Sequence, residues 1–178
     1  YLLGYQDPRL SAYFEASPSA YAVAAFDGKN YQAVPPGNAN QQNTIYTDFS
    51  KPNITSNTPT YWMRASEVYF LRAEAALRGW GNETGATVAG RLYEEGVRAS
   101  MNYYGIASDK AEEYISHLEG KDAFNGGSRE EQLEQIITQK WLAVFPNGNE
   151  GWAEFRRTDY PALQNQLTNE SGGDVPQG

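Results

Sequence analysis

The chain has 178 residues, a length typical of one domain that buries about 70% of its unfolded surface without covalent support. It contains no cysteine, so no disulfide scaffold forms, and its net charge of −8 argues against nucleic acid as a partner, because phosphate binding needs clustered Lys and Arg. No stretch approaches the roughly 18 to 20 continuous apolar residues of a membrane span.

The opening YLLGYQDPRL reads as the interior of a polypeptide, because it has neither an initiating Met nor a charged-then-apolar signal segment. We therefore expect a piece of a longer protein that carries any targeting signal elsewhere. Over residues 1–178 we predict a single domain, with an irregular region at 1–59, a helical scaffold at 60–161 and a polar tail at 162–178.

Residues 1–59 contain many turn-forming pairs, such as DP, SP, DG and PPG, and weak periodicity. Only short strands are predicted, near Tyr21 to Phe26 and Thr44 to Phe49. Aromatic residues recur every few positions, which is unlike a disordered linker. Long ordered loops of this kind usually pack on a rigid scaffold and often carry function.

Five aromatic residues are candidate ligand contacts, because flat rings stack on the C–H faces of sugars while Asn and Gln side chains bind the hydroxyls. Four lie in the irregular region: Tyr13, Phe14, Tyr21 and Tyr31. The fifth, Trp80, lies in a Gly-flanked turn between two predicted helices, which makes a core position harder to assign. The alternative is that the first four rings hold the loops to the helices.

The scaffold begins with a helix predicted over residues 60–79, which is rich in Ala, Leu, Arg and Glu and has no internal Gly or Pro. Opposite charges at helical neighbour spacing suggest pairs of Arg64 with Glu67 and of Glu74 with Arg78. The apolar band is wide, which predicts burial on more than one face. Its members are Trp62, Met63, Ala65, Tyr69, Phe70, Ala73, Ala76 and Leu77.

A second helix, predicted over residues 86–104, would form an antiparallel hairpin with the first. The mixture of small and aromatic residues loosely resembles a tetratricopeptide unit, although one hairpin does not establish a repeat. Such repeats need neighbours, and we expect these in the part of the protein outside this chain.

Two capping boxes predict the starts of the remaining helices. Asp109 and Glu112 have this spacing at the start of a third helix that ends near Leu118, and Ser128 and Glu131 have it at the start of a fourth. The apolar residues of the fourth helix follow i, i+3 and i+4 spacing: Leu133, Ile136, Ile137, Trp141 and Val144.

The densest cluster of rings and charges lies in residues 139–161, QKWLAVFPNGNEGWAEFRRTDYP. Its first part continues the fourth helix, its PNGN turn ends that helix, and a short new element follows. We interpret the segment as a structural clamp in which Trp152 is buried. Arg156 and Arg157 have Glu150 and the preceding helix as near partners, so a structural ion pair is favoured over an anion site.

The sequence gives little support for a catalytic site or a metal site. His117 is the only histidine, and no second ligand lies at metal spacing, so neither a metal nor another cofactor is predicted. GxSxG, HExxH and P-loop patterns are absent. The adjacent pairs Glu112 with Glu113 and Glu130 with Glu131 lie on predicted exposed faces, whereas glycosidases need carboxyls that converge across a cleft.

The segments YWMRASEVYFLRAEAAL at 61–77 and QKW…EGWAEFRRTDYP at 139–161 resemble the SusD/RagB family of bacterial surface nutrient-binding lipoproteins. The DPR triplet at residues 7–9 is similar to another family segment. The resemblance implies a mainly α fold, with tetratricopeptide-like hairpins as scaffold and an irregular aromatic-rich region that carries the ligand. It assigns structural roles to Arg64, Glu67, Glu74, Trp141, Glu150, Trp152, Arg156 and Arg157.

By the same resemblance the protein is not an enzyme. It would lie at the cell surface on the outer membrane, attached by a lipid anchor in the absent N-terminal part. It would capture an oligosaccharide or other nutrient and deliver it to a TonB-dependent, SusC-like transporter. Two alternatives stay open: a helical-repeat module that binds proteins or peptides, and a glycoside-active enzyme.

Overall fold

The computed structural model describes residues 1–19, 24–34, 45–122, 124 and 127–163. The chain forms two compact units, one made of Tyr1–Arg9 and Asn57–Ala162 and the other of Leu10–Ser56 and Leu163–Gly178. Helices dominate the described residues, which confirms the predicted mainly α class. None of these helices has the length and apolar character needed to cross a membrane.

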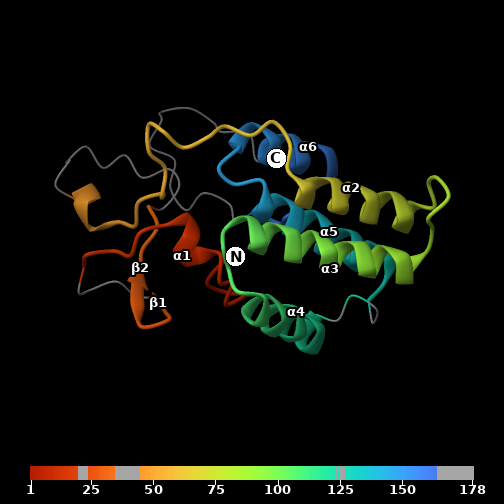
Figure 1. The fold of residues 1–178 in the computed structure, drawn as a ribbon, viewed down its shortest axis with the longest axis horizontal. Helices are drawn as coiled ribbons and strands as arrows, with labels where there is room; N and C mark the ends of the chain where they lie inside the picture. The colour runs from red at the N-terminus through yellow and green to blue at the C-terminus, as the bar shows by residue number, and fades with distance from the viewer. Residues whose placement is uncertain (20–23, 35–44, 123, 125–126, 164–178) are drawn as a thin grey trace. The chain divides into compact units, whose positions relative to one another are not determined.

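The first unit is built on a helical hairpin of α2 (Ala65–Arg78) and α3 (Ala86–Tyr103), which lie side by side in opposite directions (Figure 1). Gly79 ends α2 in a left-handed conformation with φ of 77°, which a residue without Cβ adopts at little cost. The predicted hairpin is therefore confirmed. The predicted start of α2 at Thr60 was wrong, because Arg64 is extended and its side chain is bound elsewhere.

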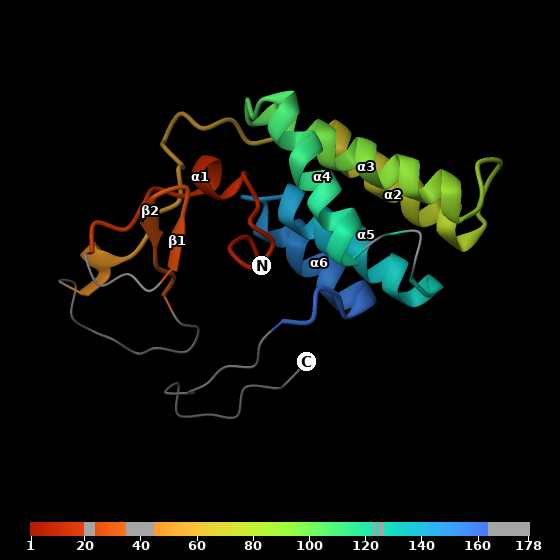
Figure 2. The same ribbon diagram turned by 90° about the horizontal axis from the view of Figure 1, so that it is seen from below.

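Three further helices complete this unit: α4 (Ser108–Asp122), α5 (Arg129–Ala143) and α6 (Gly148–Thr158). The α5 helix packs on α2, α3 and α6, and Figure 2 shows α5 and α6 side by side. The predicted capping box of α5 is confirmed, since Ser128 Oγ accepts from the Glu131 N–H and Glu131 Oε2 accepts from the Ser128 N–H. Asn147 caps α6 in a similar way through the Glu150 N–H.

The capping box predicted from Asp109 and Glu112 was wrong. The carboxylate of Glu112 instead accepts two hydrogen bonds from Arg98 of α3, at 2.7 and 3.0 Å. The helix still begins at Ser108, so the position of the start was right while the mechanism was not. A guanidinium from the neighbouring helix competes for the carboxylate, and sequence spacing within one helix cannot reveal that partner.

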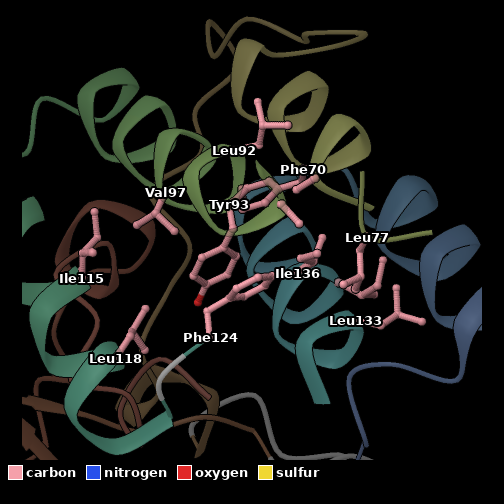
Figure 3. Close-up of a cluster of buried hydrophobic side chains, with 14 of the residues drawn as sticks. Phe70, Leu77, Leu92, Tyr93, Val97, Ile115, Leu118, Phe124, Leu133 and Ile136 are labelled. Atoms are coloured by element: carbon pink, nitrogen blue, oxygen red, sulfur yellow. The ribbon is translucent and has the colours of Figure 1, made fainter. Parts of the chain in front are cut away.

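The core of the first unit lies where α2, α3, α4 and α5 meet (Figure 3). Phe70 is fully buried and contacts Tyr93 edge-on, with ring centroids 6.3 Å apart, and Tyr93 stacks on Phe124 at 5.2 Å. Such ring pairs add about 0.5–1.5 kcal/mol beyond the area that they bury. Branched side chains fill the remaining space, among them Leu77, Leu92, Val97, Ile115, Leu118, Leu133 and Ile136.

The second unit has short elements separated by irregular chain, as predicted for this region. After α1 (Leu10–Tyr13), the strands β1 (Ala24–Phe26) and β2 (Lys29–Tyr31) pair antiparallel through a two-residue Asp27-Gly28 turn. Both turn residues have positive φ, 48° and 70°, as in the hairpin turn that such a pair favours. The strand predicted near Thr44 to Phe49 was wrong, because Ile45–Asp48 forms a 3-10 helix.

The contact between Gly96 of α3 and Phe70 of α2 generates a stability prediction. A Cβ at position 96 would lie 2.7 Å from Phe70 Cε1, and the Phe70 side chain is fully buried. We expect Gly96→Ala to lower the free energy of unfolding by about 1–2 kcal/mol, because overpacking outweighs the gain in helix propensity. Urea unfolding measures this change.

The matched control is Gly148→Ala at the first residue of α6, where an added Cβ meets nothing within 4 Å. This variant should be neutral or slightly stabilising, by about 0.4–1 kcal/mol at most. Equal stability of the Gly96→Ala and Gly148→Ala proteins would show that α2 and α3 do not approach as closely as the structure indicates.

Candidate functional site

The closing segment 139–161 forms the end of α5, a turn and α6, as the sequence predicted. Gly151 lets α6 approach α5, since a Cβ there would lie 3.3 Å from Trp141 Nε1. Trp141 is half-buried, and the ring of Tyr1 lies 5.8 Å away, centroid to centroid. The segment therefore joins two helices and the first residue of the chain.

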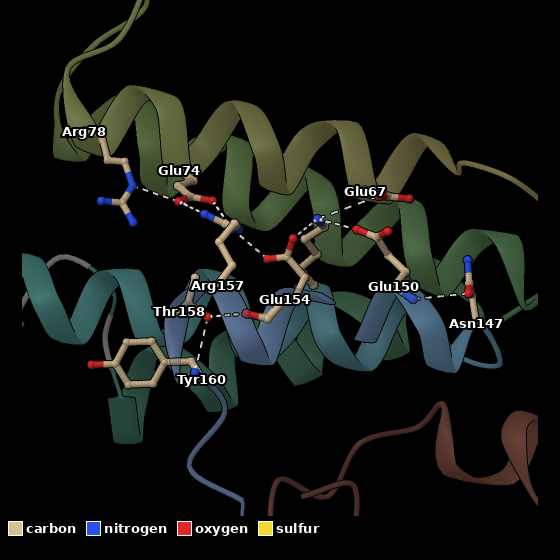
Figure 4. A network of polar contacts seen from close by, with 10 residues as sticks. Glu67, Glu74, Arg78, Asn147, Glu150, Glu154, Arg157, Thr158 and Tyr160 are labelled. Carbon is tan, nitrogen blue, oxygen red and sulfur yellow. Dashed lines mark hydrogen bonds and ion pairs between the residues drawn. The ribbon is translucent and has the colours of Figure 1, made fainter. Parts of the chain in front are cut away.

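Lys140 is the centre of this arrangement, because its ammonium group is buried among three carboxylates. Its Nζ lies 2.6 Å from Glu154 Oε1, 3.2 Å from Glu150 Oε1 and 3.7 Å from Glu67 Oε1. Its side chain is only 2% exposed. Glu67 belongs to α2, whereas Glu150 and Glu154 belong to α6, so one ammonium on α5 connects three helices (Figure 4).

A second set of ion pairs continues from this site along α2 and α6. Arg157 donates to both carboxylate oxygens of Glu74 at 2.7 Å and to Glu154 Oε2 at 2.7 Å, and Arg78 donates to Glu74 at 2.8 Å. The bidentate geometry fixes direction as well as distance. We call the whole set the ionic cluster: Glu67, Glu74, Arg78, Lys140, Glu150, Glu154 and Arg157 (Figure 4).

The pKa values of the two buried α2 carboxyls of the ionic cluster are shifted in opposite directions. Burial raises the pKa of Glu67, and the neighbouring carboxylates Glu150 and Glu154 raise it further against the attraction of Lys140. Burial also acts to raise the pKa of Glu74, but hydrogen bonds and charge from Arg157 and Arg78 outweigh it, so that pKa lies below its ordinary value. The cluster holds four carboxyls and three cations, and a proton on Glu67 would balance its charge.

A second buried charge lies at Arg9, which is fully enclosed. Its guanidinium forms a bidentate pair with Asp7, at 2.9 and 2.5 Å, and donates to Ser100 Oγ and to Gln139 Oε1. Gln139 in turn donates to the hydroxyl of Tyr114, whose pKa burial raises. This network ties the DPR segment to α3, α4 and α5, and its donors and acceptors satisfy each other in a dry environment.

Arg64 connects the start of α2 to the end of α5. Its Nη1 donates to the carbonyl oxygens of Ala143 and Phe145, at 3.1 and 2.7 Å, and to the Tyr104 hydroxyl at 2.8 Å. The guanidinium also lies over the ring of Tyr103, 4.4 Å from its centroid. A cation that binds the last carbonyls stabilises a helix C-terminus. The expected pair of Arg64 with Glu67 was therefore wrong, because each has other partners.

The structure places the five candidate ligand residues in different environments. Tyr13 and Tyr31 are packed, at 1% and 4% exposed, and Phe14 is half-buried. Tyr21 lies outside the described residues. Trp80 is 60% exposed in the turn after α2, and the guanidinium of Arg78 lies 5.3 Å from its ring centroid. Ligand contact by these residues stays a prediction, and Trp80 presents the most accessible ring of the four that are described.

A hollow lies close to Trp80 within the same unit. It has a volume of about 560 Å³, and apolar Leu77 and Leu133 line it together with polar residues. The polar residues are Arg78, which also contacts the Trp80 ring, Ser128, Arg129 and Glu130. An apolar surface with a few polar groups at its edge is typical of sites for small ligands.

Two predictions for the closing segment need correction. Trp152 is 58% exposed and stacks on Phe155 on the outer side of α6, so it is not the buried aromatic that we expected. The structural ion pair of Arg157 is present, but with Glu74 and Glu154 instead of Glu150. Arg156 is exposed. The 3.6-residue period of α6 explains why Trp152 and Arg156 are exposed, because Gly151 and Glu154 occupy the inner face of the helix.

Sequence reasoning overlooked Lys140, Glu154, Asp7 and Arg9 as buried charges. A signal for Lys140 was present, since it lies between Ile136 and Val144 on a helix with a broad apolar side. Charged residues at such positions are almost never fully buried unless they are paired. The partners of Lys140 could not be identified, because they lie on other helices.

The carboxylates weighed for catalysis each have a structural partner. Glu113 pairs with Lys110, Glu131 caps α5, and Glu130 accepts from the Tyr160 hydroxyl at 2.8 Å. Within the described part of the chain, no group of His, Asp and Glu residues is arranged to hold a metal ion. The arrangement of these carboxylates supports helix packing and supplies no acid and base pair across a cleft.

The opposite pKa shifts of Glu67 and Glu74 generate a pH prediction. Folding raises the pKa of Glu67 above 4.5, so the stability that this shift contributes is present at low pH and is lost as pH rises above 4.5. Folding lowers the pKa of Glu74 below 4.5, so the stability that this shift contributes is lost as pH falls below 4.5. Relative to the parent protein, Glu67→Gln should gain stability as pH rises, and Glu74→Gln should lose it. Urea unfolding between pH 3 and 8, about the range over which carboxyls titrate, measures both slopes. Slopes of the same sign would contradict the assignment.

The family model described as "Starch-binding associating with outer membrane", SusD-like, matches residues 1–177. No curated protein matches the chain. A SusD homologue from Bacteroides ovatus is 38% identical with a TM-score of 0.79, and the match covers 99% of this chain and 40% of that one. A SusD homologue from Bacteroides uniformis is 36% identical with a TM-score of 0.77, and the match covers 99% of this chain and 39% of that one.

A chitin-binding SusD homologue from Flavobacterium johnsoniae is 36% identical with a TM-score of 0.73, and the match covers 97% of this chain and 38% of that one. The chain thus spans about 40% of the length of the solved structures that it matches. These matches confirm the resemblance seen in residues 61–77 and 139–161. The chain belongs to the SusD-like family.

Proposed function

We propose that the protein of which this chain forms part binds an oligosaccharide without turning it over. The observation that carries this proposal is the match to a starch-binding family over residues 1–177. A relative of similar fold and 36% identity binds chitin, which is also a polymer of sugar rings. Starch and chitin are different polysaccharides. The family relationship therefore supports a sugar as the ligand, and experiment must identify which sugar.

The geometry supports Trp80 as one contact for the sugar. Its ring is 60% exposed, and Arg78 anchors one side of it while lining the neighbouring hollow. A fixed aromatic ring offers a flat apolar surface at low entropic cost, because few torsions are lost on binding. The adjacent Ser128, Arg129 and Glu130 supply hydrogen-bonding groups for hydroxyls.

We infer further that the bound sugar is delivered to a TonB-dependent, SusC-like transporter at the outer membrane. The family description, which associates its members with the outer membrane, supports this location. A lipid anchor in an N-terminal part of a longer chain would hold the protein at the cell surface. Binding without catalysis suits delivery, since the cargo must leave unchanged.

A glycoside-active enzyme is the less favoured candidate. Glu112 and Glu113 pair with Arg98 and Lys110, and Glu131 is occupied as a helix cap. These carboxylates pair with cations or cap a helix, whereas glycosidases need two carboxyls that converge across a cleft. Release of reducing sugar by the purified protein would restore this candidate.

Calorimetry on the full-length protein tests the proposal, with chitin oligosaccharides, malto-oligosaccharides and a peptide panel as titrants. We expect one class of oligosaccharide to bind and the peptides to give no heat. Trp80→Ala should weaken sugar binding about tenfold or more, because truncation of a central aromatic contact commonly costs about 2 kcal/mol or more.

Trp152→Ala is the matched control, because Trp152 is similarly exposed, at 58%, but belongs to α6 and does not line the hollow. It should leave the sugar affinity unchanged. Tight peptide binding without any sugar response would refute the carbohydrate assignment. Sugar binding that is equally strong in the Trp80→Ala protein would refute Trp80 as a contact while leaving the function intact.

A further inference from the structure

The hollow near Trp80 differs in charge from the chain as a whole. Its described lining residues include two cations, Arg78 and Arg129, and one acidic residue, Glu130. The whole chain carries a net charge of −8, so a concave surface on which cations outnumber carboxylates departs from the average of the molecule. Cations gathered in a cleft raise the local concentration of anionic ligands. The charges that line the hollow therefore favour a ligand of negative charge.

Arg129 is the cation of the hollow that is available to a ligand. It is the first residue of α5 and is exposed. It has no carboxylate partner among the residues that the structure describes. By contrast, Arg72, Arg98 and Arg157 each form an ion pair with a glutamate. A ligand at Arg129 thus displaces no ion pair of the described residues.

Arg78 is held in position by contacts within the protein. Its Nε donates to Glu74 Oε1 at 2.8 Å, and its guanidinium lies 5.3 Å from the centroid of the Trp80 ring. Figure 4 shows its two terminal nitrogens directed away from Glu74. A side chain that is already ordered loses little conformational freedom when a ligand binds. Arg78 therefore offers positioned hydrogen-bond donors beside an exposed aromatic ring.

Glu130 is the acidic residue that lines the hollow, and its carboxylate has a partner within the protein. Its Oε1 accepts a hydrogen bond from the Tyr160 hydroxyl at 2.8 Å. The negative charge of Glu130 balances one of the two lining arginines, so a positive charge is left for a ligand.

A carboxylate matches these groups better than a neutral hydroxyl does. Guanidinium groups bind carboxylates through two parallel N–H···O bonds, which are shorter and stronger than bonds to neutral acceptors. A uronic acid is a sugar that carries a carboxylate on its ring, so it combines an anion with the C–H face that stacks on an aromatic side chain. The hollow, at about 560 Å³, has the size of a site for a small ligand.

We propose that the hollow binds an acidic oligosaccharide, one that contains uronic acids. Trp80 stacks on a sugar ring, and Arg78 and Arg129 bind the carboxylates. This inference rests on the proposed function, because it names the class of sugar that the same site selects. Neutral oligosaccharides bind at this site through Trp80 with lower affinity, since they leave the charges of the two arginines without a partner.

Calorimetry on the full-length protein tests this inference with oligosaccharides of galacturonic acid and of hyaluronan, each as the free acid and as its methyl ester. Esterification removes the charge and keeps the sugar backbone, and chitin oligosaccharides serve as a neutral reference. We expect a free acid to bind about tenfold or more tightly than its ester, because hydrogen bonds between charged groups are the stronger ones. NaCl at about 1 M, where the Debye length is roughly 3 Å, should remove most of this preference.

Two substitutions of Arg129 separate its charge from its other effects. Arg129→Gln keeps hydrogen-bond donors but removes the charge, so the ratio of acid affinity to ester affinity should fall about fivefold, as expected for the loss of one exposed ion pair. Arg129→Lys keeps the charge and should retain part of the ratio. Arg156→Gln is the matched control, because Arg156 is exposed on α6 and does not line the hollow, and it should leave the ratio unchanged.

The outcomes distinguish this inference from the proposed function. Free acids that bind no more tightly than their esters or than chitin oligosaccharides would overturn the acidic class, while neutral binding that depends on Trp80 would leave the proposed function intact. A preference for acids that survives in the Arg129→Gln protein would also overturn the inference, because the charge would then act elsewhere. Absence of binding by every oligosaccharide, acidic or neutral, would refute the proposed function and this inference together.

Discussion

The buried ammonium of Lys140 is the interaction on which the helical unit depends. Transfer of an isolated charge from water into a protein interior costs several kcal/mol even after relaxation, so Lys140 needs its carboxylates in place. Glu154 and Glu150 come from α6 and Glu67 comes from α2, which fixes both helices against α5. A hydrophobic contact would tolerate sliding, whereas an ion pair at 2.6 Å in a dry site does not.

The other buried cations repeat this principle at other junctions. Arg9 joins the start of the chain to Ser100 and Gln139, which are 91 and 130 residues away in sequence. Arg64 binds the carbonyls at the end of α5. Charges that look like a ligand site in the sequence therefore hold distant segments together. Ligand contact by an exposed ring such as Trp80 stays a prediction, and it would leave recognition to residues outside this scaffold.

The helices were predictable from sequence because their signals are local. The capping box at Ser128 and Glu131, the glycine at 79 and the apolar spacing of α5 each act within a few residues. The burial of Lys140 was not predictable, because its carboxylate partners lie on other helices. Trp152 shows the same limit: its ring suggested burial, but the short α6 has little inner surface, which Gly151 and Glu154 occupy.

A double-mutant cycle between Lys140 and Glu154 tests the central claim most directly. Lys140→Met, Glu154→Gln and the double variant are unfolded in urea beside the parent protein, with the exposed pair Lys110 and Glu113 as a control cycle. We predict a coupling energy of about 1–3 kcal/mol for the buried pair, as is found for residues in one network, and at most about 1 kcal/mol for the exposed pair. A coupling energy for Lys140 and Glu154 no larger than that of the control would contradict the account.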